Sequence, residues 1–306
     1  MRNLRAGVIG LGWAGTVHCQ VLEALAGVDL VAVADTAYRD VSHLLTLGLD
    51  YCVVATPTET HEQIGILLAE VGINAIIEKP LASTLTAANK LIEAFATNGL
   101  VATVGHTERR NPAIREVATR LRDGEFGAIH AISTRRNSPF PERIRDVGVV
   151  TDIAIHDVDL AAWLAARPIE SVSARIRHVS GHPHEDLATA VCKLDDETLA
   201  TIQVSRITPF KERILTVHAE AGTITADAVS RTVTHYTSAG ALTSEITGPE
   251  PFQAQHEAFL DALRGRGDDI VSLSEGAAAV AVTEAIHRSA RTGTACAVEN
   301  LEANPR

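Results

Sequence analysis

The sequence predicts an α/β protein in which a doubly wound parallel sheet is followed by a mainly antiparallel sheet. Strand and helix patterns alternate through the N-terminal third, which is typical of a parallel sheet with helices on both faces. In the rest of the chain, strand patterns follow one another across short turns, which favours antiparallel pairing. We therefore expect two domains, residues 1–108 and 109–306.

Composition argues against several classes of protein. The chain has 306 residues, of which 46% are hydrophobic and 21% charged, enough for one large or two ordinary folded domains. Its formal net charge is −11 without a long basic run, which argues against nucleic acid and against an anionic membrane as partner. No apolar run reaches the length of a membrane span, and Met1–Arg5 leads into a strand pattern without a recognisable signal peptide.

The four cysteines show neither metal nor redox spacing. Cys19, Cys52, Cys192 and Cys296 fall in segments with strand or helix patterns. Buried, reduced thiols are the simplest explanation, so we expect a cytoplasmic protein.

A glycine-rich turn follows the first strand pattern, Ala6–Ile9, and precedes a helical pattern over Thr16–Ala26. The turn reads Gly10-Leu-Gly12-Trp-Ala-Gly15, which is G-x-G-x-x-G between a strand and a helix. Glycines at this spacing permit a tight turn and let the backbone approach a pyrophosphate at the helix N-terminus. We expect the cofactor contacts of this turn at Gly10, Gly12, Trp13, Ala14 and Gly15.

A second strand pattern, Leu30–Ala34, ends at Asp35. A carboxylate at this position can accept hydrogen bonds from a ribose 2′-hydroxyl, so the whole unit predicts a Rossmann-type domain that binds a dinucleotide. Asp35 would repel a 2′-phosphate and therefore favours NAD, whereas the nearby Arg39 keeps NADP open. The following segment, Thr36–Tyr51, is short for a regular Rossmann unit, with one modest helical pattern near Val41–Leu47, so we expect an open adenine side.

Three more buried strand patterns, Cys52–Ala55, Ala75–Ile77 and Val101–Val104, alternate with helical patterns over Thr60–Val71 and Leu85–Asn98. Ligands of doubly wound sheets bind beyond the carboxyl ends of the strands. The polar residues at these ends are Thr56, Glu78, Lys79 and His106.

Lys79 stands directly after a buried strand and is fixed by Pro80. A lysine there is costly unless it has a partner or a function. We interpret it as a functional lysine; the alternatives are a salt bridge to Glu78 or a solvated side chain.

A carboxylate and an imidazole occur together in the stretch Thr151–Asp159. Asp152 and His156 are four residues apart, so a helix would place them on one face, one turn apart. Most neighbouring residues are apolar, which indicates a largely buried helix. A histidine beside a carboxylate is a usual general base; the alternative is a core histidine satisfied by that carboxylate.

Arginines gather shortly before this stretch, at the end of the strand pattern Ile129–Arg136 and beyond it. They are Arg135, Arg136, Arg143 and Arg145. In an acidic protein such a local group can bind phosphate or carboxylate bidentately, and the alternative is salt bridging to neighbouring acids.

Six further strand patterns and two helical patterns complete the chain. The strands are Ile169–His178, Ala188–Lys193, Leu199–Ser205, Ile214–Ala219, Gly222–Ala226 and Thr232–Tyr236. The helices are Gln255–Leu263 and Glu275–Thr292. The uncovered face of such a sheet is a natural subunit interface, so we expect a homo-oligomer, a dimer or a tetramer.

One polar loop resembles a metal cluster in composition. It contains His178, His182, His184, Glu185 and Asp186, but their spacing fits no standard metal site. We expect a loop or pocket rim and no metal.

Taken together, the ordered motifs resemble the glucose–fructose oxidoreductase and inositol dehydrogenase family, also called Gfo/Idh/MocA. The resemblance spans most of the chain and rests on Gly10–Gly15, Ala55–Thr58 with His61, Glu78-Lys79-Pro80, Gly105-His106 with Asn111-Pro112, and Asp152 with His156. It implies an NAD(P)-binding N-terminal domain and a C-terminal domain with an open, mainly antiparallel sheet.

The same resemblance implies roles for particular residues. Lys79, Asp152 and His156 would form the catalytic group. The cofactor site would also include Thr56, Pro57, His61, Glu78, Lys79 and His106. Substrate contacts are expected at Lys79, Arg136, Arg143, Asp152 and His156.

Two longer stretches, Gly105–Pro112 and Arg135–Arg143 leading to Asp152–Asp159, are similar to members that oxidise nucleotide-linked amino sugars, such as UDP-N-acetylglucosamine at ring carbon three. We therefore expect an NAD-dependent oxidoreductase acting on a secondary alcohol of a sugar. The alternatives are a free-sugar or inositol-type dehydrogenase, an NADPH-dependent ketosugar reductase, and a cofactor-sensing regulatory protein on the same fold. Whether Lys79 or His156 takes the proton stays open.

Overall fold

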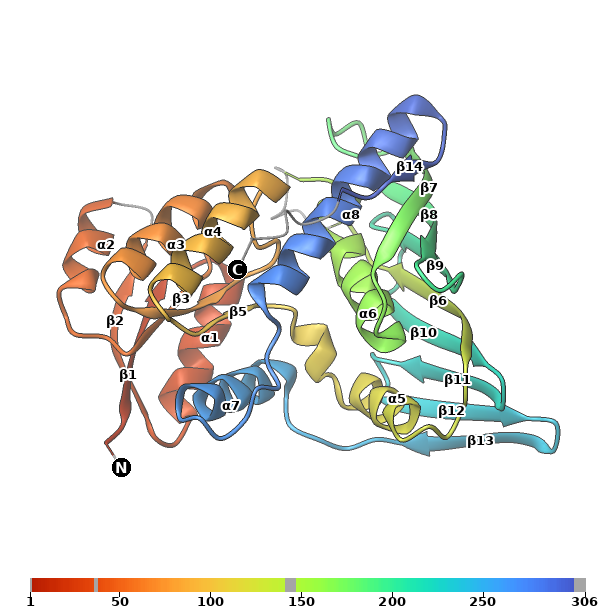
Figure 1. The fold of residues 1–306 in the computed structure, drawn as a ribbon, viewed down its shortest axis with the longest axis horizontal. Helices are drawn as coiled ribbons and strands as arrows, with labels where there is room; N and C mark the ends of the chain where they lie inside the picture. The colour runs from red at the N-terminus through yellow and green to blue at the C-terminus, as the bar shows by residue number, and fades with distance from the viewer. Residues whose placement is uncertain (1, 36–37, 141–146, 300–306) are drawn as a thin grey trace. The chain divides into compact units, whose positions relative to one another are not determined.

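The computed structural model describes residues 2–35, 38–140 and 147–299 and divides into two compact units (Figure 1). The first unit includes the chain up to Thr107 and Glu250–Val280, and the second comprises Glu108–Pro249 and Ala281–Asn300. The predicted boundary near residue 108 is close to the first division, but Glu250–Val280 groups with the N-terminal residues. Which function each unit carries stays a prediction.

The first unit contains a five-stranded parallel sheet with the order β2-β1-β3-β4-β5. The strands are β1 Leu4–Ile9, β2 Val28–Ala34, β3 Tyr51–Val54, β4 Asn74–Ile77 and β5 Ala102–Val104. The helices are α1 Trp13–Ala24, α2 Tyr38–Leu45, α3 His61–Glu70, α4 Leu85–Thr97 and α7 Pro251–Leu263, with the short turn η1 at Thr58–Thr60. This confirms the predicted doubly wound sheet.

The chain reverses direction across this sheet between β1 and β3. From β1 it passes through α1 to β2 on one side, then through α2 to β3 on the other, and continues through α3 and α4. Right-handed crossovers therefore place α1 on one face and α2, α3 and α4 on the other (Figure 1). Ligands of this fold bind at the reversal point, which lies beyond the carboxyl ends of β1 and β3.

Helix α7 completes the core of the first unit and explains why residues distant in sequence group with it. Phe259 is fully buried and Leu260 almost so, and both lie in one cluster with Ala6 and Val8 of β1. The ring of Phe259 meets that of Tyr51 edge-on, with 5.4 Å between centroids. Burial of this apolar face stabilises the first unit.

The second unit contains a nine-stranded sheet in which every pair is antiparallel except β6 with β9. Its strands, in chain order, are β6 Ile129–Asn137, β7 Ile169–Arg177, β8 Leu187–Leu194, β9 Leu199–Ser205, β10 Glu212–Ala219, β11 Gly222–Asp227, β12 Thr232–Thr237, β13 Gly240–Glu245 and β14 Cys296–Ala297. The predicted mainly antiparallel sheet is confirmed.

The helical segments that belong to this unit are η2 Thr107–Arg110, α5 Pro112–Arg122, the π-helical turn η3 Val150–Ala154 and α6 Ile155–Ala165. Helix α5 packs on β11 and β12, and α6 packs on β6 and β9. The unit boundary at Val280 falls within the last helix, α8, Leu273–Thr292. On the described part of the chain, no helix is both long and apolar enough to cross a bilayer.

Among the described residues, two strands and one α-helix were not predicted. Strand β13 is exposed at every position and so lacks the alternation that identifies a half-buried strand. Strand β14 has only two residues. Helix α5 does carry a start signal, because Asn111 caps it by accepting the Ala113 N–H at 3.0 Å and Pro112 occupies its first turn.

Candidate active site

The three glycines of the turn after β1 have different structural roles. Gly10 has φ +93°, and a Cβ on it would lie 2.5 Å from the carbonyl oxygen of Ala55. A Cβ on Gly15 would overlap the carbonyl oxygen of Gly10, so both positions serve the fold itself. A Cβ on Gly12, by contrast, would meet nothing within 4 Å. Gly12 therefore leaves open space over the backbone at the start of α1, which fits a pyrophosphate at a helix N-terminus.

Asp35 lies exposed just beyond β2, and its Oδ1 accepts the Leu11 N–H at 3.4 Å. The turn also carries Trp13, 57% exposed, whose ring meets Phe252 of α7 edge-on at 5.9 Å. The structure thus brings Asp35 to the glycine turn, as the predicted dinucleotide site requires. Together these residues can hold NAD, which supplies a hydride acceptor when bound.

His61 connects two further strand-end turns of the first unit. Its Nδ1 lies 2.9 Å from the carbonyl oxygen of Pro80 and its Nε2 2.9 Å from that of Thr56. Burial lowers the pKa of His61, although the hydrogen bonds to the Thr56 and Pro80 carbonyl groups oppose this shift. A neutral ring can donate to only one of these two carbonyl oxygens at a time. Its predicted contact with a cofactor, like those of Thr56 and Pro57, stays a prediction.

Lys79 follows β4, is half-buried, and forms a cis peptide bond with Pro80. Its backbone N–H donates to Glu78 Oε2 at 3.3 Å. His106, at the end of β5, is almost fully buried. The predicted residues Glu78, Lys79 and His106 are therefore at the carboxyl ends of neighbouring strands, where the sequence analysis expected them.

A buried hydrogen-bonded chain behind Lys79 was not predicted. Glu78 Oε1 lies 3.1 Å from Nε2 of His18, and Nδ1 of His18 lies 2.8 Å from Nε2 of His256. Burial alone would raise the pKa of Glu78, but the hydrogen bond from His18 and the charges of His18 and Lys79 lower it. A carboxylate with these partners fixes the turn that presents Lys79.

Gly105 makes room for this carboxylate, because a Cβ there would lie 2.5 Å from Glu78 Oε1. The feature of the sequence that could have pointed to His18 is its position on α1, the helix that follows the glycine turn. His256 comes from α7, and no local pattern connects it with residue 78.

In the second unit, Asp152 and His156 lie on a helical segment, as predicted, but its first turn is wider than an α-turn. The Ile155 N–H donates to the Val150 carbonyl five residues earlier, and regular α6 begins only at Ile155. Both side chains are half-buried, whereas Ile153, Ala154 and Ile155 between them are buried. Such π-turns occur frequently at functional sites. The predicted one-turn spacing assumed α geometry throughout, which this turn does not have.

Arg136 is only 6% exposed and is held by two carboxylates. Its Nη2 lies 2.9 Å from Asp157 Oδ1, and its Nη1 lies 3.2 Å from Glu108 Oε1. Burial alone would lower the pKa of Arg136, but Asp157 and Glu108 raise it, so the guanidinium stays charged. Its predicted contact with substrate stays a prediction. Arg143 and Arg145 lie outside the described residues.

Arg213 is the direct cross-strand partner of Arg136 in the pairing of β10 with β6. Like charges in that position repel, and Glu108 bridges them by also contacting Arg213 Nη1 at 2.5 Å. Lys211 adds a third cation, and its pKa is lowered chiefly by the charge of Arg213. Neither Arg213 nor Lys211 was predicted from the sequence, although Arg213 lies on a strand directly opposite Arg136. Among the described residues, this cation cluster consists of Arg136, Arg213 and Lys211, and it contains two carboxylates, Glu108 and Asp157.

Two other arginines near this cluster are paired with acids. Arg135 points to the other face of β6 and holds Glu212 through two hydrogen bonds of 2.7 and 2.8 Å. Arg109 and Asp159 form a buried pair at 2.6 Å. In the polar loop, the described residues include no group of three or more potential ligands placed for a metal ion.

The fold and the glycine turn define an oxidoreductase of the class that binds a nicotinamide dinucleotide in a Rossmann-type unit, and comparison with known proteins identifies the family. The model described as "Oxidoreductase family, NAD-binding Rossmann fold" matches residues 4–106, and that described as "GFO/IDH/MocA C-terminal domain" matches residues 114–225. The chain therefore belongs to the Gfo/Idh/MocA oxidoreductase family. The predicted family, fold class and NAD cofactor are confirmed.

Individual relatives agree with this assignment. The chain is 32% identical over 221 residues to UDP-N-acetylglucosamine 3-dehydrogenase of Acidithiobacillus ferrooxidans, covering 68% of each chain. The crystal structure of that protein superimposes with a TM-score of 0.87 at 26% identity, covering 95% of this chain and 99% of the other. Inositol 2-dehydrogenase 2 of Saccharopolyspora erythraea is 30% identical over 204 residues, 60% of each chain. GenD2 from gentamicin A biosynthesis, solved in complex with NAD, gives a TM-score of 0.87 at 25% identity and covers 98% and 97% of the two chains.

The glycine turn provides a matched pair of variants. Gly12→Ala should fold like the wild type, because its new Cβ enters open space, but should raise the Kd for NADH about tenfold or more by blocking the pyrophosphate. Gly15→Ala should instead destabilise the fold by about 1–3 kcal/mol, because its Cβ overlaps the Gly10 carbonyl oxygen. Urea denaturation and fluorescence titration measure the two effects. Wild-type NADH affinity in Gly12→Ala would contradict this assignment of the cofactor site.

Proposed function

We propose that the chain is an NAD-dependent dehydrogenase acting on a secondary alcohol of a nucleotide-linked amino sugar. The observation that carries the substrate class is the cation cluster Lys211–Arg213–Arg136 in the second unit of a protein with a net charge of −11. Long-range attraction cannot gather an anion to so acidic a chain, so a local cluster has to do it. The relative that oxidises UDP-N-acetylglucosamine supports the same substrate class.

In the proposed reaction, the C–H bond of the alcohol carbon breaks with its electron pair leaving as hydride to the nicotinamide, and the O–H proton goes to a base of the protein. The alcohol becomes a ketone, and the cofactor is reduced. His156 takes the proton, Lys79 hydrogen-bonds the hydroxyl oxygen and stabilises the developing alkoxide, and Asp152 orients substrate or supports the charged imidazole. The version in which Lys79 takes the proton gives the same products.

Arg213 is the better candidate for contact with a phosphate than Arg136. Among the described residues, the side chain of Arg213 is 33% exposed and forms one ion pair with a carboxylate, whereas that of Arg136 is 8% exposed and forms two. An arginine that is partly exposed keeps donors for a ligand, and its planar fork matches two phosphate oxygens. Arg136 then acts by holding Glu108 and Asp157 in place.

A free-sugar or cyclitol dehydrogenase is the second candidate. It is favoured by the likeness to inositol 2-dehydrogenase 2 and by the two carboxylates that already neutralise Arg136. A neutral substrate would leave the cation cluster without a ligand.

We also propose that the chain forms a homo-oligomer through the sheet of the second unit. Helices α5 and α6 pack on this sheet from the same side (Figure 1). Val191 of β8 and Leu199 of β9 are 45% and 47% exposed, which suits a face that a second subunit covers.

The exposed carboxylate of Asp35 should select NAD. We expect the Kd for NADPH to exceed that for NADH by about tenfold or more, because Asp35 would repel a 2′-phosphate. Fluorescence titration with both cofactors measures the ratio, and Asp35→Ser should reduce it. Tighter binding of NADPH than NADH by the wild type would overturn the prediction.

Lys79→Ala and His156→Ala should each lower kcat by ~10²–10⁴-fold while the Kd for NADH changes little, because acid–base groups act on the chemical step. Matched controls are Lys90→Ala, whose side chain is 56% exposed, and His218→Ala, which is also exposed. Steady-state kinetics with a sugar substrate and NADH titration separate the two effects. Near wild-type kcat in either variant would remove that residue from the mechanism.

Arg213→Met and Lys211→Ala should raise KM for a UDP-sugar about 10–100-fold, because a hydrogen bond to a charged group contributes about 1.5–3 kcal/mol. KM for a neutral inositol or aldose should stay unchanged in both variants. Arg135→Ala is the matched control, since Arg135 lies on the opposite face of the same sheet and pairs with Glu212. A strong preference for neutral substrates, with unaffected arginine and lysine variants, would leave the free-sugar or cyclitol dehydrogenase.

A further inference from the structure

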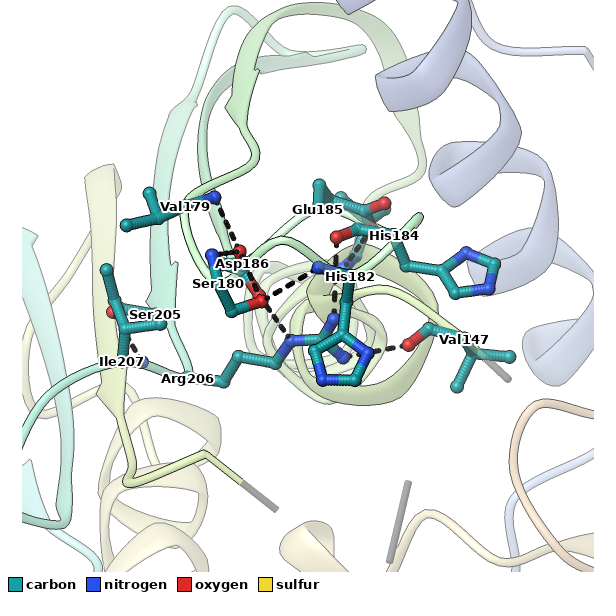
Figure 2. Close-up of polar contacts among 11 residues, drawn as sticks. Val147, Val179, Ser180, His182, His184, Glu185, Asp186, Ser205, Arg206 and Ile207 are labelled. Atoms are coloured by element: carbon teal, nitrogen blue, oxygen red, sulfur yellow. Dashed lines mark hydrogen bonds and ion pairs between the residues drawn. The ribbon is translucent and has the colours of Figure 1, made fainter. Parts of the chain in front are cut away.

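The loop between β7 and β8 packs against the start of the helical segment that carries Asp152 and His156 (Figure 2). Glu185, only 5% exposed, makes two contacts there. Its carbonyl oxygen accepts the Val149 N–H at 3.0 Å, and its carboxylate Oε1 accepts the Val150 N–H at 2.9 Å. These are amides that a helix start leaves without an intrahelical partner, so Glu185 acts as a cap supplied by another element.

The absence of a side chain at Gly148 makes room for the capping carboxylate of Glu185. A Cβ on Gly148 would overlap the carboxylate of Glu185, so the carboxylate lies directly against the backbone at this residue. The carbonyl oxygen of Gly148 in turn accepts the Asp152 N–H at 3.0 Å. Gly148, which directly precedes the capped residues Val149 and Val150, is therefore linked to Asp152 by one backbone hydrogen bond.

Arg206, at the end of β9, holds the residue before Gly148. It is 1% exposed, its Nη1 donates to the Val147 carbonyl at 2.8 Å, and its Nε donates to Asp186 Oδ1 at 3.0 Å. Figure 2 shows Arg206 reaching between Asp186 and Val147. Only a guanidinium makes both contacts at once, because its donors form a rigid fork.

Asp186 supplies the opposite charge. It is fully buried and accepts the N–H groups of Val179 at 2.6 Å and Ser180 at 2.7 Å, as well as the Ser180 hydroxyl. Burial alone would raise the pKa of Asp186, but these amide hydrogen bonds lower it, so the carboxylate stays ionised beside Arg206. The charge of Arg206 is thereby balanced.

We propose that Glu185 and Arg206 are positioning residues that set the start of η3 and so the placement of Asp152 and His156. Glu185 fixes the amides of Val149 and Val150, and Arg206 fixes the carbonyl of Val147. This inference rests on the proposed function for the roles of Asp152 and His156. A displacement of about 1 Å at reacting groups can cost up to about 10²-fold in rate, which gives the positioning its catalytic effect.

The π-turn is the reason that this start needs outside support. The Val150 carbonyl bonds five residues ahead, to Ile155, instead of four. The Asp152 N–H keeps an α-type bond to Gly148, but the wide turn that follows interrupts regular α-helical bonding, so contacts from the β7–β8 loop and from Arg206 after β9 help to set where Asp152 lies.

The test compares Glu185→Ala, which removes the acceptor for Val150, with Glu185→Gln, which keeps an oxygen in the same place. Arg206→Lys is the second variant, because lysine keeps a charge beside Asp186 but cannot also reach Val147. Glu245→Ala, at an exposed carboxylate of β13, is the matched control. Hydrogen–deuterium exchange of the full chain is followed over residues 147–156, with NADH affinity and kcat measured on the same preparations.

In Glu185→Ala and Arg206→Lys, we expect amide exchange over residues 147–156 to quicken about tenfold or more, with exchange in the first unit unchanged. We expect kcat with the sugar substrate to fall about 10–100-fold while KM and the Kd for NADH change about twofold at most. Glu185→Gln should restore both kcat and exchange to within about threefold of wild type. The control should match wild type in every measurement.

Unchanged exchange over residues 147–156 in both Glu185→Ala and Arg206→Lys would overturn the inference, and so would a Glu185→Gln variant as impaired as Glu185→Ala. If Glu185→Ala does not fold, Arg206→Lys and Glu185→Gln decide the matter. A wild-type protein that oxidises none of the sugars would refute the proposed function alone, because the exchange measurements still report whether these residues set the start of η3.

Discussion

An ionised side chain that leaves water needs an opposite charge or several hydrogen bonds, because removing one partner of a buried pair costs about 3–5 kcal/mol. This constraint shapes the surroundings of three buried charged groups. Glu78, beside Lys79, is met by His18. Arg206, behind Asp152, is met by Asp186, and Arg136 is met by Asp157 and Glu108. In each case the buried pair joins segments that are distant in sequence.

These pairs do more than balance charge. Glu78, Glu185 and Arg206 each also bond backbone groups, at Lys79, Val150 and Val147 respectively. A charged side chain with a backbone partner fixes the main chain, which a pair of exposed side chains does not. The core of the chain is mostly aliphatic, with aromatics at 4%, so polar groups of this kind add the directionality that packing of small apolar side chains lacks.

Much of the fold and part of the site could be predicted because the signals are local. The continuous apolar run at Tyr51–Val54 marks a strand covered on both faces, and the glycines from Gly10 to Gly15 mark the turn after β1. The predictions missed Arg213 because its importance comes from its pairing with Arg136 across two strands. They also missed His256, since it comes from α7, which joins the core of the first unit only through tertiary packing; the His256 ring lies 6.4 Å from that of Tyr51.

The sequence by itself determined most of the strands and helices, the glycine turn after β1, and the family, because each depends on residue types at short spacings. Tertiary structure alone decided how the polar groups are used. Glu185 and Asp186, which looked like part of a metal cluster, cap a helix start and hold Arg206. Glu250–Val280 joins the N-terminal unit because the apolar face of α7 fits that core. The physical reason is that burial and long-range pairing depend on which distant segments the fold brings into contact, and no local pattern in the chain encodes that information.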